Sequence, residues 1–139
     1  MAASRQSLQA AALFGAVSGM RTFAGPAALA LRGRPQPAWA RGAILALAAS
    51  EAVVDKLPIA TPRSDPPGLA GRIVAGATLG ALTAGWPGAG IGATTAAAST
   101  FACERARAAL VRLTGLPDPA VAVAEDTLAY GGAWLASAP

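Results

Sequence analysis

Six ionisable side chains lie inside otherwise apolar stretches of this sequence. They are Arg21, Glu51, Asp55, Arg72, Glu125 and Asp126. A charge at membrane depth costs about 2.5–3.5 kcal/mol on insertion scales, so each one needs a partner, a water-filled cavity or a place near the interface. Carboxylates held there can bind a cation or carry a proton, because burial raises the pKa of a carboxyl group. An arginine among them can hold these carboxylates or receive an anion. The six residues are therefore predicted to form a polar centre that binds a small ion or solute.

Arg21 lies near the middle of its apolar stretch, and the residues after it favour a break in the helix. Ser18, Thr22 and Gly25 share its helical face by 3-and-4 spacing. Pro26 removes a backbone donor just beyond, which invites a kink or an unwound stretch. Broken helices of this kind mark binding sites in small transporters. A continuous helix with a structural ion pair at Arg21 is the alternative.

Two further groups of acids sit in later stretches. Glu51 and Asp55 are four residues apart and so lie on one helical face, where they could bind a cation or carry a proton. Alternatively, Glu51 pairs with Arg21 and Asp55 with a loop arginine. Glu125 and Asp126 are adjacent, and neighbouring helical residues point about 100° apart. One is therefore expected near Arg21 or Arg72, and the other against a neighbouring helix or chain.

Several other classes of site are disfavoured by what the chain contains. It has no histidine and one cysteine, which argues against His-ligated metals and Ser-His-Asp catalysis, so no metal, cofactor or enzymatic activity is expected. The run Gly88–Ala93 matches a dinucleotide-binding spacing, but Pro87 precedes it and the pattern downstream is helical, whereas that motif follows a strand. The net charge of +4 comes from basic residues that flank apolar runs, so nucleic acid is not an expected partner.

The elements that must position these side chains are apolar segments. The 139 residues suffice for one domain, and 54% of them are hydrophobic while only 13% are charged, about half the usual share of about 25%. The fold class predicted is an all-α integral membrane bundle of four or five short Ala- and Gly-rich transmembrane helices, the first of them broken. In the four-crossing version, either the fifth segment or the broken first segment is re-entrant. The segments span residues 8–31, 39–57, 69–86, 89–110 and 119–137.

Small residues are expected to hold the bundle together. GxxxG spacings occur at Gly15/Gly19, at Gly76/Gly80 and at Gly88/Gly92. Such spacings let helix backbones approach closely in a bilayer, where hydrophobicity does not drive association. The close packing is expected either within one chain or also between copies in a homo-oligomer. The turn near Gly85 is so short that the third and fourth segments must be antiparallel neighbours.

Basic residues near the segment ends favour a cytoplasmic N-terminus, because that arrangement places most of them on the cytoplasmic side. This orientation would reverse if the first segment were a hairpin. The expected location is the bacterial inner (plasma) membrane.

The order of the charged elements resembles that of a known family. These elements are Gly19-Met20-Arg21-Thr22-Phe23 with Pro26, Glu51-Ala52-Val53-Val54-Asp55-Lys56-Leu57-Pro58, Arg72 opening a Gly-rich helix, and Glu125-Asp126. The family comprises small bacterial membrane proteins, with relatives in plants, and is catalogued only as a domain of unknown function. The resemblance covers most of the chain, and Glu-x-x-x-Asp-Lys-x-Pro is its most specific part. It implies a multi-pass membrane protein whose charged elements belong together, and it implies no activity.

Three functions are compatible with these features. The first is a small transporter or channel for an ion or solute, working as a homo-oligomer in the lipid bilayer. The second is a structural or assembly membrane protein whose buried charges fix helix register, without transport. The third is a membrane enzyme acting on lipid, which is disfavoured because no nucleophile, histidine or metal motif accompanies the paired acids.

Overall fold

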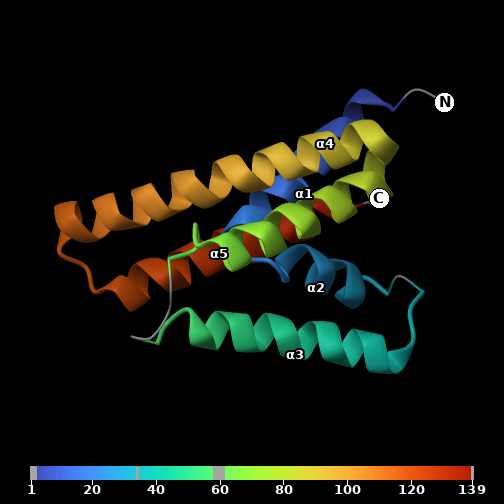
Figure 1. The fold of residues 1–139 in the computed structure, drawn as a ribbon. Helices are drawn as coiled ribbons and strands as arrows, with labels where there is room; N and C mark the ends of the chain where they lie inside the picture. The colour runs from blue at the N-terminus through green and yellow to red at the C-terminus, as the bar shows by residue number, and fades with distance from the viewer. Residues whose placement is uncertain (1–2, 34, 58–61, 139) are drawn as a thin grey trace.

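The computed structural model describes residues 3–33, 35–57 and 62–138, and within these residues the chain forms α-helices and no strand (Figure 1). The helices are α1 (Arg5–Met20), α2 (Ala24–Leu31), α3 (Ala38–Val54), α4 (Pro66–Thr114) and α5 (Asp118–Ala136). The predicted all-α class is confirmed. Pro58, the last residue of the Glu-x-x-x-Asp-Lys-x-Pro element, lies outside the described residues.

The first apolar segment is two helices that run in opposite directions (Figure 1). α1 and α2 are separated by Arg21–Phe23, as the sequence around Pro26 predicted. The two ends of the hairpin also meet the same end of α5, because Arg32 donates to the carbonyl of Trp134 at 2.9 Å while Ser4 and Ala136 line one cavity. The alternative of one continuous helix over residues 8–31 is therefore wrong, and the break is sharp enough to turn the chain back.

α4 is a second helical hairpin, with its turn at Ala84 and Gly85 (Figure 1). Gly85 has φ 65° and ψ −152°, a conformation that side-chain-bearing residues rarely adopt. Pro87 follows and fits the first turn of the second arm. The predicted break and the antiparallel arrangement of the third and fourth segments are thus confirmed.

The glycine spacings form one continuous seam inside the chain. In the two arms of α4, Gly80 packs on Gly88, and a Cβ added to Gly76 would lie 2.5 Å from the carbonyl oxygen of Gly92. α1 packs on the second arm of α4, where Gly15 meets Gly92 and where Gly19 of α1 meets the backbone next to Ser99. Ser99 also donates to the carbonyl of Ala16 at 2.7 Å. The three spacings therefore pack against one another within a single chain.

The remaining predicted segments match helices, although their ends differ. α3 covers most of residues 39–57 and stops at Val54, and α5 covers residues 119–137 within one position at each end. The second arm of α4 continues past the predicted end at residue 110 to Thr114, and Gly115 with φ 67° ends it. Among the helices of the described residues, none is at once long enough and apolar enough to cross a membrane.

Buried and exposed residues are distributed unusually. The buried apolar residues are mostly alanines, with Phe14, Val17, Leu79 and Val121 as the larger ones. Many large apolar side chains instead point outward, and Trp86 is 91% exposed. Arginine side chains lie inside, as the next section describes. The chain thus packs small residues and charges within the bundle and presents bulky apolar residues outside.

Candidate functional site: a network of charged residues

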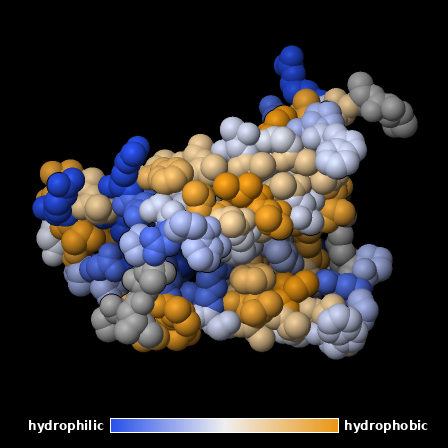
Figure 2. All heavy atoms as spheres, viewed as in Figure 1, coloured by the Kyte–Doolittle hydropathy of each residue, from blue (hydrophilic) through white to orange (hydrophobic). Residues whose placement is uncertain are grey.

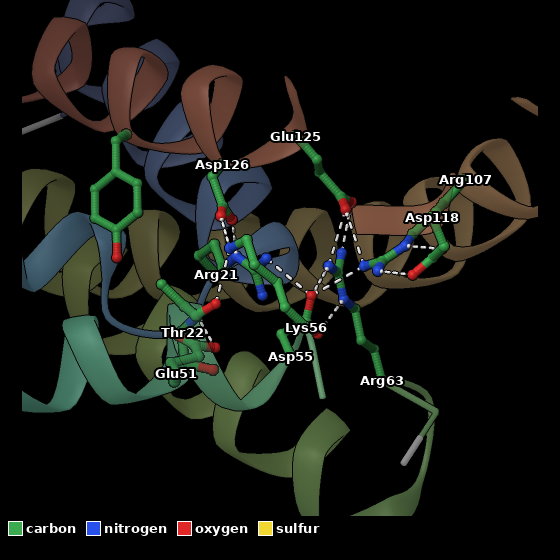
Figure 3. A network of polar contacts seen from close by, with 12 residues as sticks. Arg21, Thr22, Glu51, Asp55, Lys56, Arg63, Arg107, Asp118, Glu125 and Asp126 are labelled. Atoms are coloured by element: carbon green, nitrogen blue, oxygen red, sulfur yellow. Dashed lines mark hydrogen bonds and ion pairs between the residues drawn. The ribbon is translucent and has the colours of Figure 1, made fainter. Parts of the chain in front are cut away.

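A network of ion pairs joins side chains from α3, α4 and α5 with Arg21 at the end of α1 (Figure 3). At the start of α2 the network is bonded only to backbone N–H groups, which donate to Glu51. Its members, referred to below as the charge network, are the basic residues Arg21, Lys56, Arg63, Arg72 and Arg107 and the acidic residues Glu51, Asp55, Asp118, Glu125 and Asp126. Equal numbers of each sign make it neutral overall. All six of the predicted site residues belong to it.

The break between α1 and α2 places Arg21 at the centre of the network. Arg21 has an extended backbone, with φ −144° and ψ 117°, so its side chain leaves the α1 axis. The side chain is completely buried. Its guanidinium pairs with Asp55 at 2.8 Å and with Asp126, and Asp126 also binds Lys56 at 2.5 Å. The prediction that one acid of the Glu125-Asp126 pair meets Arg21 is therefore confirmed for Asp126.

Glu51 occupies the N-terminus of α2. Its two carboxylate oxygens accept the backbone N–H groups of Thr22 at 2.9 Å and of Phe23 at 3.1 Å. These donors have no partner within the broken helix, and a negative charge is favoured at a helix N-terminus. Glu51 lies 3.7 Å from Arg72 and does not pair with Arg21, so the alternative of a Glu51–Arg21 pair is wrong.

Arg63, from the segment before α4, links two acids that lie far apart in the sequence. It donates to Asp55 at 2.9 Å and 3.3 Å and to Glu125 at 2.5 Å and 2.8 Å. Each contact is a two-pronged arginine–carboxylate pair, the strongest geometry for such a bond. The expectation that Asp55 pairs with a loop arginine is confirmed, and Glu125 points away from Asp126 toward Arg63, as the 100° offset predicted.

Arg107, on the second arm of α4, closes the network at the start of α5. It donates to Asp118 at 2.5 Å and 2.8 Å and to Asp55 at 2.9 Å. Asp118 is the first residue of α5, and its side chain caps no backbone N–H group there. The carboxylate of Asp118 therefore serves the charge network and not the start of its own helix.

Four members were not among the predicted site residues: Lys56, Arg63, Arg107 and Asp118. All four lie at or near helix ends, where sequence reasoning assigns charged residues to the water interface. The signal that could have found them is the arithmetic of charge. The four acids within the apolar stretches need more cations than Arg21 and Arg72 provide, and Arg63 and Arg107 are further arginines close to those stretches in the sequence.

Charge pairing shifts the pKa of two groups outside the predicted spans. The hydrogen bond from Arg107 lowers the pKa of Asp118. Burial alone would lower the pKa of Arg63, but its bonds to Glu125 and Asp55 outweigh burial and raise it. Both residues are therefore held in their charged forms.

A cavity of about 160 Å³ adjoins the network beside α3 and the start of α4. Its charged lining residues are Glu51, Asp55, Arg63 and Arg72. Within the described residues, Nε of Arg72 and Nη1 of Arg21 are buried and have no hydrogen-bond partner. No three acidic, cysteine or histidine side chains of the described residues converge as a metal site requires. Within the described residues, the buried groups of the network that lack a hydrogen-bond partner are thus arginine N–H donors.

No protein-family model, curated protein or solved structure matches this chain.

Proposed function

We propose that this chain is an integral membrane protein of the bacterial inner (plasma) membrane, with lipid around most of its outer surface. The distribution of side chains supports this proposal. Trp39, Trp86 and Leu113 are at least 77% exposed, while Arg21 is 0% exposed. Water as the only solvent would favour the reverse. Figure 2 shows apolar residues over the middle of the visible face and hydrophilic ones mainly at the end where α3 stops.

The proposed orientation places the end of the bundle that carries most of its basic residues in the cytoplasm. The last residues of α3 and of α4 lie toward that end, close in sequence to Lys56 and Arg112, whereas α1 and α3 begin at the other end, close to Arg5 and Arg41 (Figure 1). Basic residues concentrate on the cytoplasmic side of membrane proteins. Because α1 and α2 form a hairpin, this criterion places the N-terminus on the opposite side, reversing the orientation that a single first span would give.

We propose that the protein is a transporter or channel for a small ion or solute. The observation that carries this proposal is the cavity lined by charged residues beside a broken helix, within a bundle whose outside is apolar. Transporters place their sites where a helix is broken and its half-helix termini meet the solute. Arg72 would contact the solute, Glu51 and Asp55 would line the cavity that holds it, and Arg21 would fix the positions of Asp55 and Asp126 beside it.

A structural or assembly role is the second candidate, and a specific observation favours it. Arg21, the most deeply buried charge, is paired with Asp55 and Asp126, and each acid also binds a second cation. Such a closed arrangement holds helices in register without transporting any ion or solute. A second copy of the chain would then be the natural partner for α3, of which only Ala48 is buried.

Flux through proteoliposomes distinguishes the two candidates. Vesicles containing the protein and a pH-sensitive dye would be challenged in turn with an acid pulse, a potassium gradient, acetate and phosphate. Transport predicts flux of at least one probe, and it predicts that Glu51→Gln or Asp126→Asn changes this flux. Arg41→Gln is the matched control, because Arg41 is exposed on α3 outside the network. Wild-type protein without flux, or both variants folded with unchanged flux, would contradict transport and favour the structural role.

A further inference from the structure

The cations of the charge network are not equally satisfied. Arg21 contacts two acids, Arg63 makes four hydrogen bonds to two acids, and Arg107 makes three such bonds. Arg72 has only Glu51, at 3.7 Å, and a single hydrogen bond to the carbonyl oxygen of Arg63 at 2.9 Å. Its charge is therefore the least compensated of the four arginines, although Arg72 is only 7% exposed.

Arg72 also lines the cavity, and its Nε hydrogen has no partner among the described residues. A buried guanidinium with an unmet donor is costly, because its desolvation is not repaid by a hydrogen bond. The cavity volume of about 160 Å³ is well above the roughly 10–15 Å³ that a single water requires on this measure. That space suits a carboxylate or phosphate group, and guanidinium binds both with two parallel hydrogen bonds.

Glu51 shows which chemistry this place accepts. Its carboxylate already sits between Arg72 and the N-terminus of α2, where Thr22 and Phe23 donate their backbone N–H groups. Glu51 thus places an oxyanion of the chain itself near Arg72, but at 3.7 Å it is too far away for a full hydrogen bond. The other acid of the cavity, Asp55, is bound by Arg21, Arg63 and Arg107, so it is not free to satisfy Arg72.

We propose that the cavity binds a small oxyanion, carried by a carboxylate or phosphate group, through Arg72, with Glu51 as an internal competitor. This inference rests on the proposed function, since it names the class of solute that the polar centre would take. The same chemistry occurs in a free solute and in the headgroup of an acidic lipid. Binding would draw Arg72 toward the oxyanion and leave Glu51 on the N-terminus of α2.

The test is binding to the full chain in maltoside micelles, which contain no oxyanion. Inorganic phosphate, acetate and a short-chain phosphatidic acid are titrated separately by calorimetry, with ionic strength held constant by choline chloride. Saturable binding of phosphate or acetate supports a free solute as ligand. Saturable binding of phosphatidic acid alone supports the same oxyanion site with a lipid headgroup as its source. Wild-type protein that binds none of the three overturns the proposal.

Two variants give opposite expected shifts. Arg72→Gln should weaken binding at least about tenfold, because the paired guanidinium is lost, and Arg72→Lys should give an intermediate affinity. Glu51→Gln should tighten binding about threefold or more, because the competing charge is gone. Arg41→Gln should bind as the wild type. Unchanged affinity in both Arg72→Gln and Glu51→Gln overturns the proposal, and if Arg72→Gln does not fold, Arg72→Lys and Glu51→Gln decide it.

Failure of this inference differs from failure of transport. Oxyanion binding in micelles without flux in vesicles supports the site and contradicts transport. Proton or potassium flux without oxyanion binding supports transport and overturns the site.

Discussion

Glu51 on α3 accepts the backbone N–H of Thr22 at 2.9 Å, at the point where the first apolar segment turns back on itself. With the second bond, from Phe23 at 3.1 Å, the carboxylate supplies the cap that the sequence around α2 lacks. The hairpin of α1 and α2 therefore depends on a residue from another helix. This relationship ties the break in the chain to the charge network.

Removing this cap should destabilise the fold. Glu51→Ala leaves the N–H groups of Thr22 and Phe23 without an acceptor, and loss of a helix cap costs about 0.5–2 kcal/mol. Glu51→Gln should cost less, since the amide oxygen still accepts one of the two bonds. Thermal unfolding in detergent, followed by circular dichroism, measures both. Equal stability of Glu51→Ala and the wild type would show that the cap contributes nothing.

The glycine seam gives a prediction about packing. Gly76→Ala should destabilise by about 1–3 kcal/mol, the usual cost of overpacking, because the new Cβ would meet the carbonyl of Gly92 at 2.5 Å. Gly90→Ala is the matched control on the other arm of α4, since a Cβ there meets nothing within 4 Å. It should be neutral or stabilising by up to about 1 kcal/mol, because alanine favours the helix. The order of the two midpoints in the same detergent checks the seam, and the reverse order would contradict it.

Removing an acid partner of Arg21 should strongly lower the free energy of unfolding. Asp126→Ala leaves the buried Arg21 with Asp55 alone and removes the acid partner of Lys56. Removing one partner of a buried ion pair costs about 3–5 kcal/mol. Thr127→Ala, at an exposed neighbouring position, should cost less than about 1 kcal/mol. Denaturant unfolding of the two variants measures the difference, and similar losses would mean that Asp126 is not part of a buried pair.

The pair of Arg107 and Asp118 predicts a dependence on acid pH. The pKa of Asp118 is lowered in the folded chain by its hydrogen bond from Arg107. The stabilisation is therefore fully present above the unfolded pKa of about 3.8, and it is lost as the pH falls through the lower folded value. The effect should be small and weakened by salt, because the Asp118 side chain is 55% exposed.

Comparison with Asp118→Asn isolates this effect. The difference in Tm between wild type and variant, measured from pH 6 downward, should shrink once the pH passes below about 3.8. A difference that grows under acid would contradict the sign of the pKa shift.

Local patterns in the sequence were enough to place the helices. Pro26 and the Gly85-Trp86-Pro87 turn interrupt backbone hydrogen bonding by their own chemistry, so both breaks were predictable. The angle of a break is not local. Whether the chain bends at Arg21 or reverses there depends on Glu51 and Asp126, which reach it from other helices.

The membership of the charge network was predictable in part for the same reason. Arg21, Glu51 and Asp126 stand out because they interrupt apolar stretches. Arg63 and Arg107 do not, because positions near helix ends are where charges cost little. Which acid meets which base depends on how α3, α4 and α5 come together, and Glu51 selects backbone N–H groups over the Arg21 guanidinium.

The account depends most on lipid as the solvent of the outer surface, and fractionation of cells that express the full chain tests this directly. Membranes would be washed with alkaline carbonate, and the chain would then be purified with and without detergent for size-exclusion chromatography. If lipid surrounds the outer surface, the chain stays in the washed membrane pellet and is monodisperse only in detergent. Recovery in the carbonate supernatant, as a monodisperse species in buffer alone, would contradict it.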